Sequence, residues 1–148
     1  MIWQIIGAFM ATVAGSIYLE APKNCILRTG IIGAAGWATY LLSSKIYGPV
    51  FSTYIAGLII STISHIFSRL FKVPVTIFFI PGVFPIVPGL SMYRAVYFFI
   101  KGSSQVGQGF LEETIKISGM IALSIFTIDT IFKTIGKIKK ASFLDEQD

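Results

Sequence analysis

Helix-breaking residues within an uncharged stretch form the part of this sequence best suited to bind a small molecule. The breaks in that stretch, residues 73–93, are Pro74, Pro81, Gly82, Pro85, Pro88 and Gly89. In an apolar environment they interrupt a helix and leave backbone carbonyl and amide groups that need partners in a cavity. Many transporters build binding sites from such broken helices, whose N-termini favour anions and whose freed carbonyls favour cations. A packed kink or an interfacial loop would give the same pattern.

Two basic residues follow this stretch and could contact a carboxylate. Arg94 and Lys101 are seven residues apart, so on a helix they share one face about two turns apart. A guanidinium group binds a carboxylate through two hydrogen bonds, and an arginine within an apolar helix is costly unless it faces water or a partner. Both side chains could instead extend to lipid headgroups.

Ionisable residues also occur in other apolar stretches. Glu112 and Lys116, and likewise Asp129 and Lys133, have the i,i+4 spacing that favours ion pairs on a helix. A carboxylate in a membrane-spanning helix can alternatively carry protons in a coupled transporter, which makes Asp129 a candidate for proton coupling. The single histidine, His65, could titrate near neutral pH, but we expect it to be a hydrogen-bonded packing residue.

No metal or cofactor site is predicted. Cys25 is the single cysteine, so an intrachain disulfide or a CxxC metal pair is excluded, and one histidine leaves no His/Cys cluster. Motifs of membrane hydrolases or metalloproteases, such as G-x-S-x-G and H-E-x-x-H, do not occur, so an enzyme is not expected.

The composition is that of an integral membrane protein. Of 148 residues, 54% are hydrophobic and 13% are charged, and the mean hydropathy is +0.77. Lipid or other subunits must cover so much apolar surface in so short a chain, which predicts a homo- or hetero-oligomer. The net charge of +5 arises between apolar stretches and in the tail, which indicates membrane topology and not nucleic-acid binding.

The uncharged stretches predict an all-α, polytopic bundle of about five membrane-spanning helices, since one crossing takes about 20 residues. The predicted spans are residues 1–19, 29–44, 50–68, 73–101 with its Pro/Gly break, and 110–132. We expect a tight turn at Lys45–Gly48, with Pro49 in the first turn of the next helix, and a polar turn over residues 102–109. Gly7, Ala11 and Gly15 should let another helix approach the first one closely. Four crossings and a re-entrant segment are the alternative.

Five crossings would place most basic residues on one side of the membrane. These eight are Lys23, Arg28, Arg69, Lys72, Lys133, Lys137, Lys139 and Lys140. By the positive-inside rule this side is cytoplasmic, and the N-terminus lies outside. The first helix lacks a basic n-region and is therefore expected to be retained. The chain would comprise one transmembrane domain, residues 1–136, and a short cytoplasmic tail, residues 137–148.

A short motif within the Pro/Gly stretch resembles a known family. It reads Pro85-x-x-Pro88-Gly89-x-Ser91-x-Tyr93, and Lys101 and a glycine-containing turn follow it. Pro22 before a short basic loop and a glycine-rich second span fit the same pattern. The chain resembles the threonine/serine exporter (ThrE) family, specifically its short subunits that correspond to the C-terminal half of full-length exporters. Arg94 departs from this pattern, since a small or polar residue is expected there.

The resemblance implies export of small hydrophilic metabolites across the bacterial cytoplasmic (inner) membrane, driven by the proton gradient. Threonine and serine are the namesake substrates, and split two-subunit relatives are linked to C4-dicarboxylates such as succinate. A larger partner subunit resembling the N-terminal half is also implied. We expect the motif, together with Arg94 and Lys101, to contact the substrate. The alternative is a scaffold subunit that transports nothing and whose Pro/Gly segment docks a partner helix.

Overall fold

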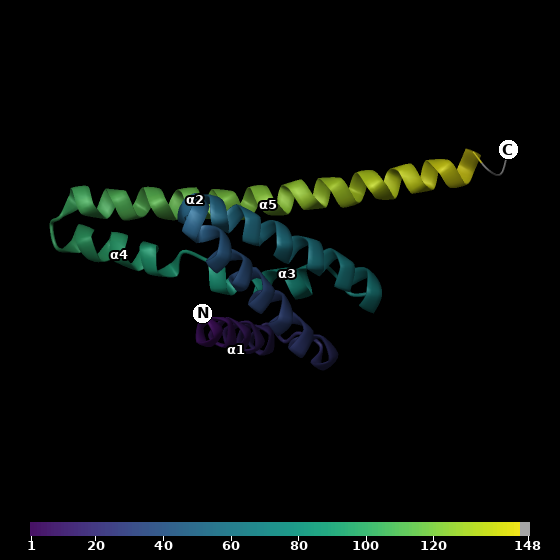
Figure 1. The fold of residues 1–148 in the computed structure, drawn as a ribbon, viewed down its shortest axis with the longest axis horizontal. Coiled ribbons are helices and arrows are strands. Elements are labelled where there is room, and N and C mark those ends of the chain that lie inside the picture. Colours follow the sequence, from purple (N-terminus) through teal and green to yellow (C-terminus); the bar gives the residue numbers. More distant parts are fainter. Residues whose placement is uncertain (146–148) are drawn as a thin grey trace.

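The elements that the structure describes are all helices, which confirms the predicted all-α class (Figure 1). The computed structural model describes the backbone of residues 1–145 and the side chains of residues 1–138. The elements are α1 (Ile2–Tyr18), α2 (Lys23–Phe71), α3 (Thr76–Val83), the 3₁₀ helix η1 (Phe84–Ile86), α4 (Gly89–Ile100) and α5 (Ser104–Asp145). The end of the predicted tail, residues 146–148, lies outside the described residues.

The 49-residue helix α2 consists of two limbs that meet at Gly48. Gly48 has φ 73° and ψ 173°, a conformation that only glycine adopts without strain, and Pro49 follows it. The first limb runs to this point and the second returns from it (Figure 1). The chain therefore reverses at the predicted position. The predicted loop before residue 29 is wrong, because α2 already begins at Lys23, directly after Pro22, and includes Arg28 in its second turn.

The Pro/Gly stretch is bent, as predicted. Helix α3 ends at Val83, Pro85 lies in η1, and Val87 is extended with φ −63° and ψ 133° before α4 begins at Gly89. The bend between the two helical halves is 52°. Proline has no amide hydrogen to donate, so the two closely spaced prolines prevent one continuous helix.

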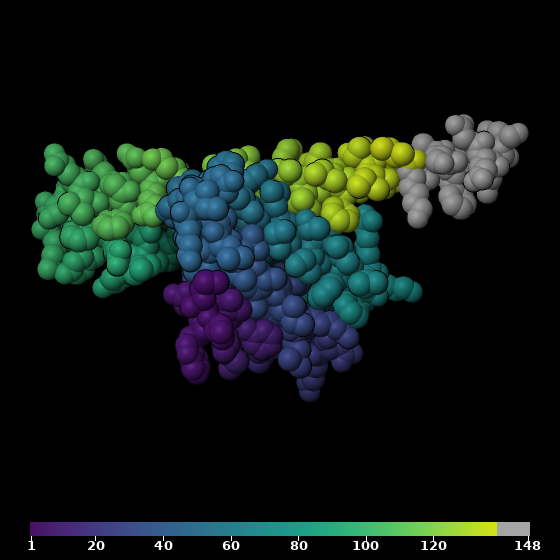
Figure 2. Space-filling view, viewed as in Figure 1, coloured from purple at the N-terminus to yellow at the C-terminus, as the bar shows by residue number. Residues whose placement is uncertain are grey.

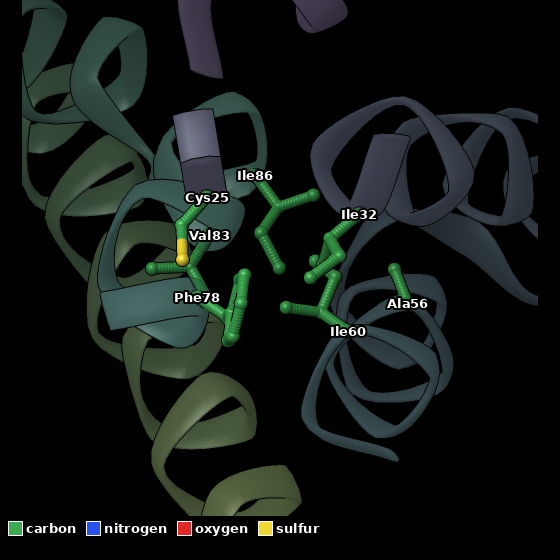
Figure 3. Close-up of a cluster of buried hydrophobic side chains, with 7 residues drawn as sticks. All are labelled: Cys25, Ile32, Ala56, Ile60, Phe78, Val83 and Ile86. Atoms are coloured by element: carbon green, nitrogen blue, oxygen red, sulfur yellow. The ribbon is translucent and has the colours of Figure 1, made fainter. Parts of the chain in front are cut away.

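The core forms where α3 and η1 pack between the two limbs of α2 (Figure 3). Phe78 is fully buried and lies with Val83 and Ile86 on one side, opposite Ile32 of the first limb and Ile60 of the second. The first half of the broken stretch is therefore fixed in the interior.

Glycines allow close helix crossings at two places. A Cβ atom at Gly33 would lie 1.9 Å from the Thr12 hydroxyl of α1, and one at Gly57 would lie 2.1 Å from the Ser124 hydroxyl of α5. The predicted stripe of small residues on α1 is confirmed in part. The ring of Phe84 occupies the space beside Gly15, whereas Gly7 has open space around it.

Helix α5 is too long to lie within one bilayer. At 1.5 Å per residue its 42 residues extend about 63 Å, twice the roughly 30 Å of the hydrocarbon core. Its N-terminal part pairs with α4, and this hairpin projects from the rest of the molecule (Figures 1 and 2). Among the described elements, α4 contacts α5 alone, and Ala95, 1% exposed, is buried in this contact.

The turn before α5 is shorter than predicted. Residues 101–103 connect the two helices, with Gly102 at φ 77°, and residues 104–109 are helical. The predicted start of the last helix at residue 110 is therefore wrong. Packing against α4 stabilises this polar first turn as helix, because Gly107 lies close to the backbone of Ala95.

Two of the described helices, α2 and α5, are long and apolar enough to cross a membrane, and the bent α3–η1–α4 segment gives a third span if it crosses as a unit. Helix α1 is apolar but shorter, at 17 residues. Five crossings would require α1 to span and α2 to cross twice, once on each side of Gly48.

Enlarging Gly57 tests the α2–α5 crossing. Gly57→Ala should lower the melting temperature of the purified protein in detergent, because the new methyl group overlaps the Ser124 hydroxyl and such overpacking costs about 1–3 kcal/mol. Adding Ser124→Gly should restore much of the loss. Gly119→Ala, on an open part of α5, is the matched control. An equal fall in melting temperature for Gly57→Ala and Gly119→Ala would contradict the close crossing.

Candidate functional site

The structure divides the predicted substrate-binding residues between two places. Pro85 lines a cavity of about 260 Å³ with Trp37 of α2 and with residues of α1. The Trp37 indole nitrogen is buried and has no hydrogen-bond partner among the described residues. Pro88 precedes α4, and a Cβ atom at Gly89, the first residue of that helix, would meet nothing within 4 Å.

The remaining predicted residues make their contacts on the α4–α5 hairpin. The Ser91 hydroxyl donates a hydrogen bond to Glu113 Oε2 at 3.4 Å. Tyr93 is exposed and stacks with Tyr97 at 6.2 Å. We find the two predicted cationic groups over aromatic rings, Arg94 5.5 Å from the Phe110 centroid and Lys101 4.8 Å from that of Tyr97. A role for these residues in substrate binding stays a prediction.

Glu113 is a carboxylate at this hairpin that the sequence did not single out. Its neighbour Glu112 forms the predicted ion pair with Lys116, with 3.1 Å between Oε2 and Nζ. Consecutive residues on a helix point about 100° apart, so Glu113 faces α4 when Glu112 faces outward. The adjacent acidic pair was the signal in the sequence that could have identified it.

A second polar site lies where α2, α3 and α5 meet. The Asp129 carboxylate forms the predicted ion pair with Lys133 through Oδ2, and its Oδ1 lies 3.9 Å from His65 Nε2. The His65 ring stacks on Phe132 at 4.6 Å with an interplanar angle of 12°, and the Arg69 guanidinium lies 4.8 Å from the centroid of the same Phe132 ring. His65 thus packs as predicted, but the expected hydrogen bond is absent among the described residues, and the ring faces the carboxylate at 3.9 Å.

A pocket of about 150 Å³ opens beside the Asp129–His65 pair, and we call it the α2–α3–α5 pocket. It is lined by Ser61, His65, Val75, Thr76, Phe79, Ile125 and Asp129. Ser61 is 2% exposed, and its hydroxyl has no hydrogen-bond partner among the described residues. Leaving a buried hydroxyl unpaired costs about 1–3 kcal/mol, so Ser61 offers an unused donor and acceptor to whatever enters the pocket.

The sequence could not predict that this pocket exists. Asp129 and His65 are far apart in the chain, and only the return of the second α2 limb alongside α5 brings them together. Ser61 is part of a polar face of α2 that continues to Tyr54. The Tyr54 hydroxyl lies 3.2 Å from the Thr127 hydroxyl of α5. Nowhere in the described part of the chain do three or more His, Cys, Asp or Glu side chains gather closely enough to hold a metal ion.

Helices that are long and apolar enough to cross a membrane, together with an interrupted helix pair, define a helical membrane protein. The chain belongs to the threonine/serine exporter family, since the family model described as "Threonine/Serine exporter, ThrE" matches residues 4–131. A curated relative, the threonine/serine exporter of Corynebacterium glutamicum, is 27% identical over 104 residues, which cover 70% of this chain. The aligned part spans 21% of that relative's length. No solved structure matches the chain.

Two substitutions of His65 separate the stability that its ring stacking contributes from the stability that its ring nitrogens contribute. His65→Phe keeps an aromatic ring against Phe132, whereas His65→Ala removes it, so the alanine variant should be about 1–2 kcal/mol less stable than the phenylalanine variant. Thermal unfolding of the purified variants in detergent measures this difference. Equal losses in the two variants would show that the ring nitrogens, and not the stack, stabilise this region.

Proposed function

We propose that this chain is one subunit of a secondary exporter of small hydrophilic metabolites, driven by the proton gradient across the bacterial cytoplasmic membrane. Its substrates would be threonine and serine or a C4-dicarboxylate such as succinate, and a larger membrane subunit would complete the transporter. The observation that carries this proposal is that Asp129 faces His65 in the α2–α3–α5 pocket. One wall of this pocket is α3, the first half of the broken helix segment.

Asp129 is the proposed proton carrier. An ionisable residue within a membrane-spanning helix is costly and is usually kept for a function. Asp129 has one oxygen engaged by Lys133 and the other facing His65 and the pocket. Its side chain is 38% exposed and that of His65 is 14% exposed, so protons can reach the carboxylate while the imidazole stays largely enclosed.

The Pro/Gly break would supply the movement that transport requires. The core holds α3 and η1, whereas α4 contacts only α5 among the described elements. A Cβ atom at Gly89 would meet nothing within 4 Å, so the proposed hinge for α4 lies at this joint. Arg94 and Lys101 lie over aromatic rings and form no ion pair among the described residues, and in this proposal one of them contacts a substrate carboxylate.

Contacts within α2 support the proposed topology. The Arg28 guanidinium lies 3.7 Å from the centroid of the Phe71 ring, so the beginning and the end of α2 lie together at one end of the bundle. Two crossings by α2 would produce this arrangement. With α1, the bent α3–α4 segment and α5, the count becomes five, with the N-terminus outside and the C-terminus in the cytoplasm.

The exposed surface supports a partner subunit. Large apolar side chains are exposed on every long helix, and those of α4 include Leu90, Tyr93 and Ile100. Lipid can cover the part of this surface within the bilayer, but α5 is longer than the bilayer is thick. The hairpin formed by α4 and the N-terminal part of α5 is therefore the proposed contact with the larger subunit.

Neutralising Asp129 tests the proposed transport. With its genomic neighbour co-expressed in a host lacking related exporters, the chain should confer export of threonine, serine or succinate that an uncoupler abolishes. Asp129→Asn should reduce this export at least tenfold, since the amide cannot carry a proton. Glu112→Gln, the same change in an exposed i,i+4 ion pair of α5, should leave export unchanged.

The same experiment addresses the scaffold alternative. A subunit that only stabilises its partner would need no acidic side chain at position 129. Full export by Asp129→Asn at normal protein levels would therefore contradict the proton-carrying role of Asp129 and favour the scaffold alternative. Immunoblots of both subunits in isolated membranes give the protein levels.

A further inference from the structure

We infer that the α2–α3–α5 pocket binds the ammonium group of a small zwitterionic ligand, and that this group and a proton compete for Asp129. The inference rests on the proposed function in that it assigns the exported substrate to this pocket. It places the ligand away from the motif residues of α4 and selects between the two substrate classes named above.

The gap between Asp129 and His65 fits an ammonium group. Their facing atoms, Oδ1 and Nε2, are 3.9 Å apart, which is too far for a direct hydrogen bond. A nitrogen placed between them at about 2.8 Å from each would form two charge-assisted hydrogen bonds. An ammonium group has a third hydrogen, and the unpaired Ser61 hydroxyl on the same pocket wall is an available acceptor.

The rest of the pocket suits a small ligand with a carboxylate. A volume of about 150 Å³ holds about five water molecules at roughly 30 Å³ each, which corresponds to a ligand of few heavy atoms. Val75, Phe79 and Ile125 give it an apolar wall. Thr76 stands at the first position of α3, where its hydroxyl and the positive end of the helix dipole favour a negative group.

Charge excludes a dicarboxylate from this pocket. Its lining contains one acidic side chain and no lysine or arginine, and the nearby Lys133 is already paired with Asp129 Oδ2. A second carboxylate next to Asp129 would be repelled. An amino acid, whose ammonium group is attracted there, is therefore the ligand class that the pocket selects.

The ammonium group and a proton compete because both would bind to the Asp129 carboxylate, at the oxygen that faces His65. When Asp129 is protonated, its neutral carboxyl group does not attract an ammonium group. A ligand that binds where Asp129 is protonated therefore displaces that proton, and return of a proton to the carboxylate releases the ligand. The charged or titratable groups around Asp129 are His65 and Arg69 on α2 and Lys133 on α5, while the α3 residues lining the pocket carry no charge.

Binding measurements on the wild-type protein test the ligand class directly. Membranes containing the chain and its partner subunit would be assayed by scintillation proximity with labelled L-threonine. Unlabelled L-serine should displace it, whereas glycerate, in which a hydroxyl replaces the ammonium group, and succinate should do so at least tenfold more weakly. Equal displacement by serine and glycerate would overturn the inference.

Variants then locate the ligand. Asp129→Asn should reduce threonine affinity at least tenfold, and Ser61→Ala should reduce it about tenfold through the loss of one charge-assisted hydrogen bond. Glu112→Gln should bind as the wild type does. Lowering the pH should weaken threonine binding by the wild type more than the residual binding by Asp129→Asn, in which a proton has no carboxylate to occupy. Normal binding by Asp129→Asn would place the ligand elsewhere.

The two proposals fail in different ways. If Asp129→Asn loses export but binds threonine normally, the carboxylate carries only the proton and the ligand site is wrong. If the wild type binds threonine with this pH dependence but shows no uncoupler-sensitive export, the pocket is right and the proposed function is wrong.

Discussion

The burial of α3 between the two limbs of α2 is the interaction on which the rest of the structure depends. Phe78 is fully buried in this contact and lies opposite Ile32 and Ile60. Fixing α3 there also fixes Val75 and Thr76 as one wall of the α2–α3–α5 pocket. Because α3 is only eight residues long, it could not be stable alone, and the limbs of α2 must hold it. The pocket and the bend after it are thus consequences of one packed core.

The parts of the fold that follow from local rules could be predicted from the sequence. Glycine followed by proline predicts the reversal at Gly48, and clustered prolines predict the bend before α4, since both act through the backbone of their own neighbourhood. The i,i+4 ion pair of Asp129 with Lys133 is equally local. Family membership also followed from a short run of residues in one segment.

The contacts between distant segments could not be predicted. His65 had a local interpretation as a packing residue, which the stack with Phe132 confirms, but its approach to Asp129 depends on how α2 and α5 pair. The predicted polar turn over residues 102–109 is wrong for residues 104–109 for the same reason. The two glycines of this segment are weak helix formers, and contact with α4 overrides that preference. Glu113 acquires its partner Ser91 only through this pairing.

The Pro/Gly break connects the two polar regions of the molecule. On one side of it α3 forms a wall of the α2–α3–α5 pocket, and on the other side α4 carries Ser91 and Arg94 along α5. Helix α5 contacts both, because Asp129 lies on the pocket and Glu113 lies against α4. The break thus separates the pocket from the hairpin along the chain, and α5 is the helix that contacts both.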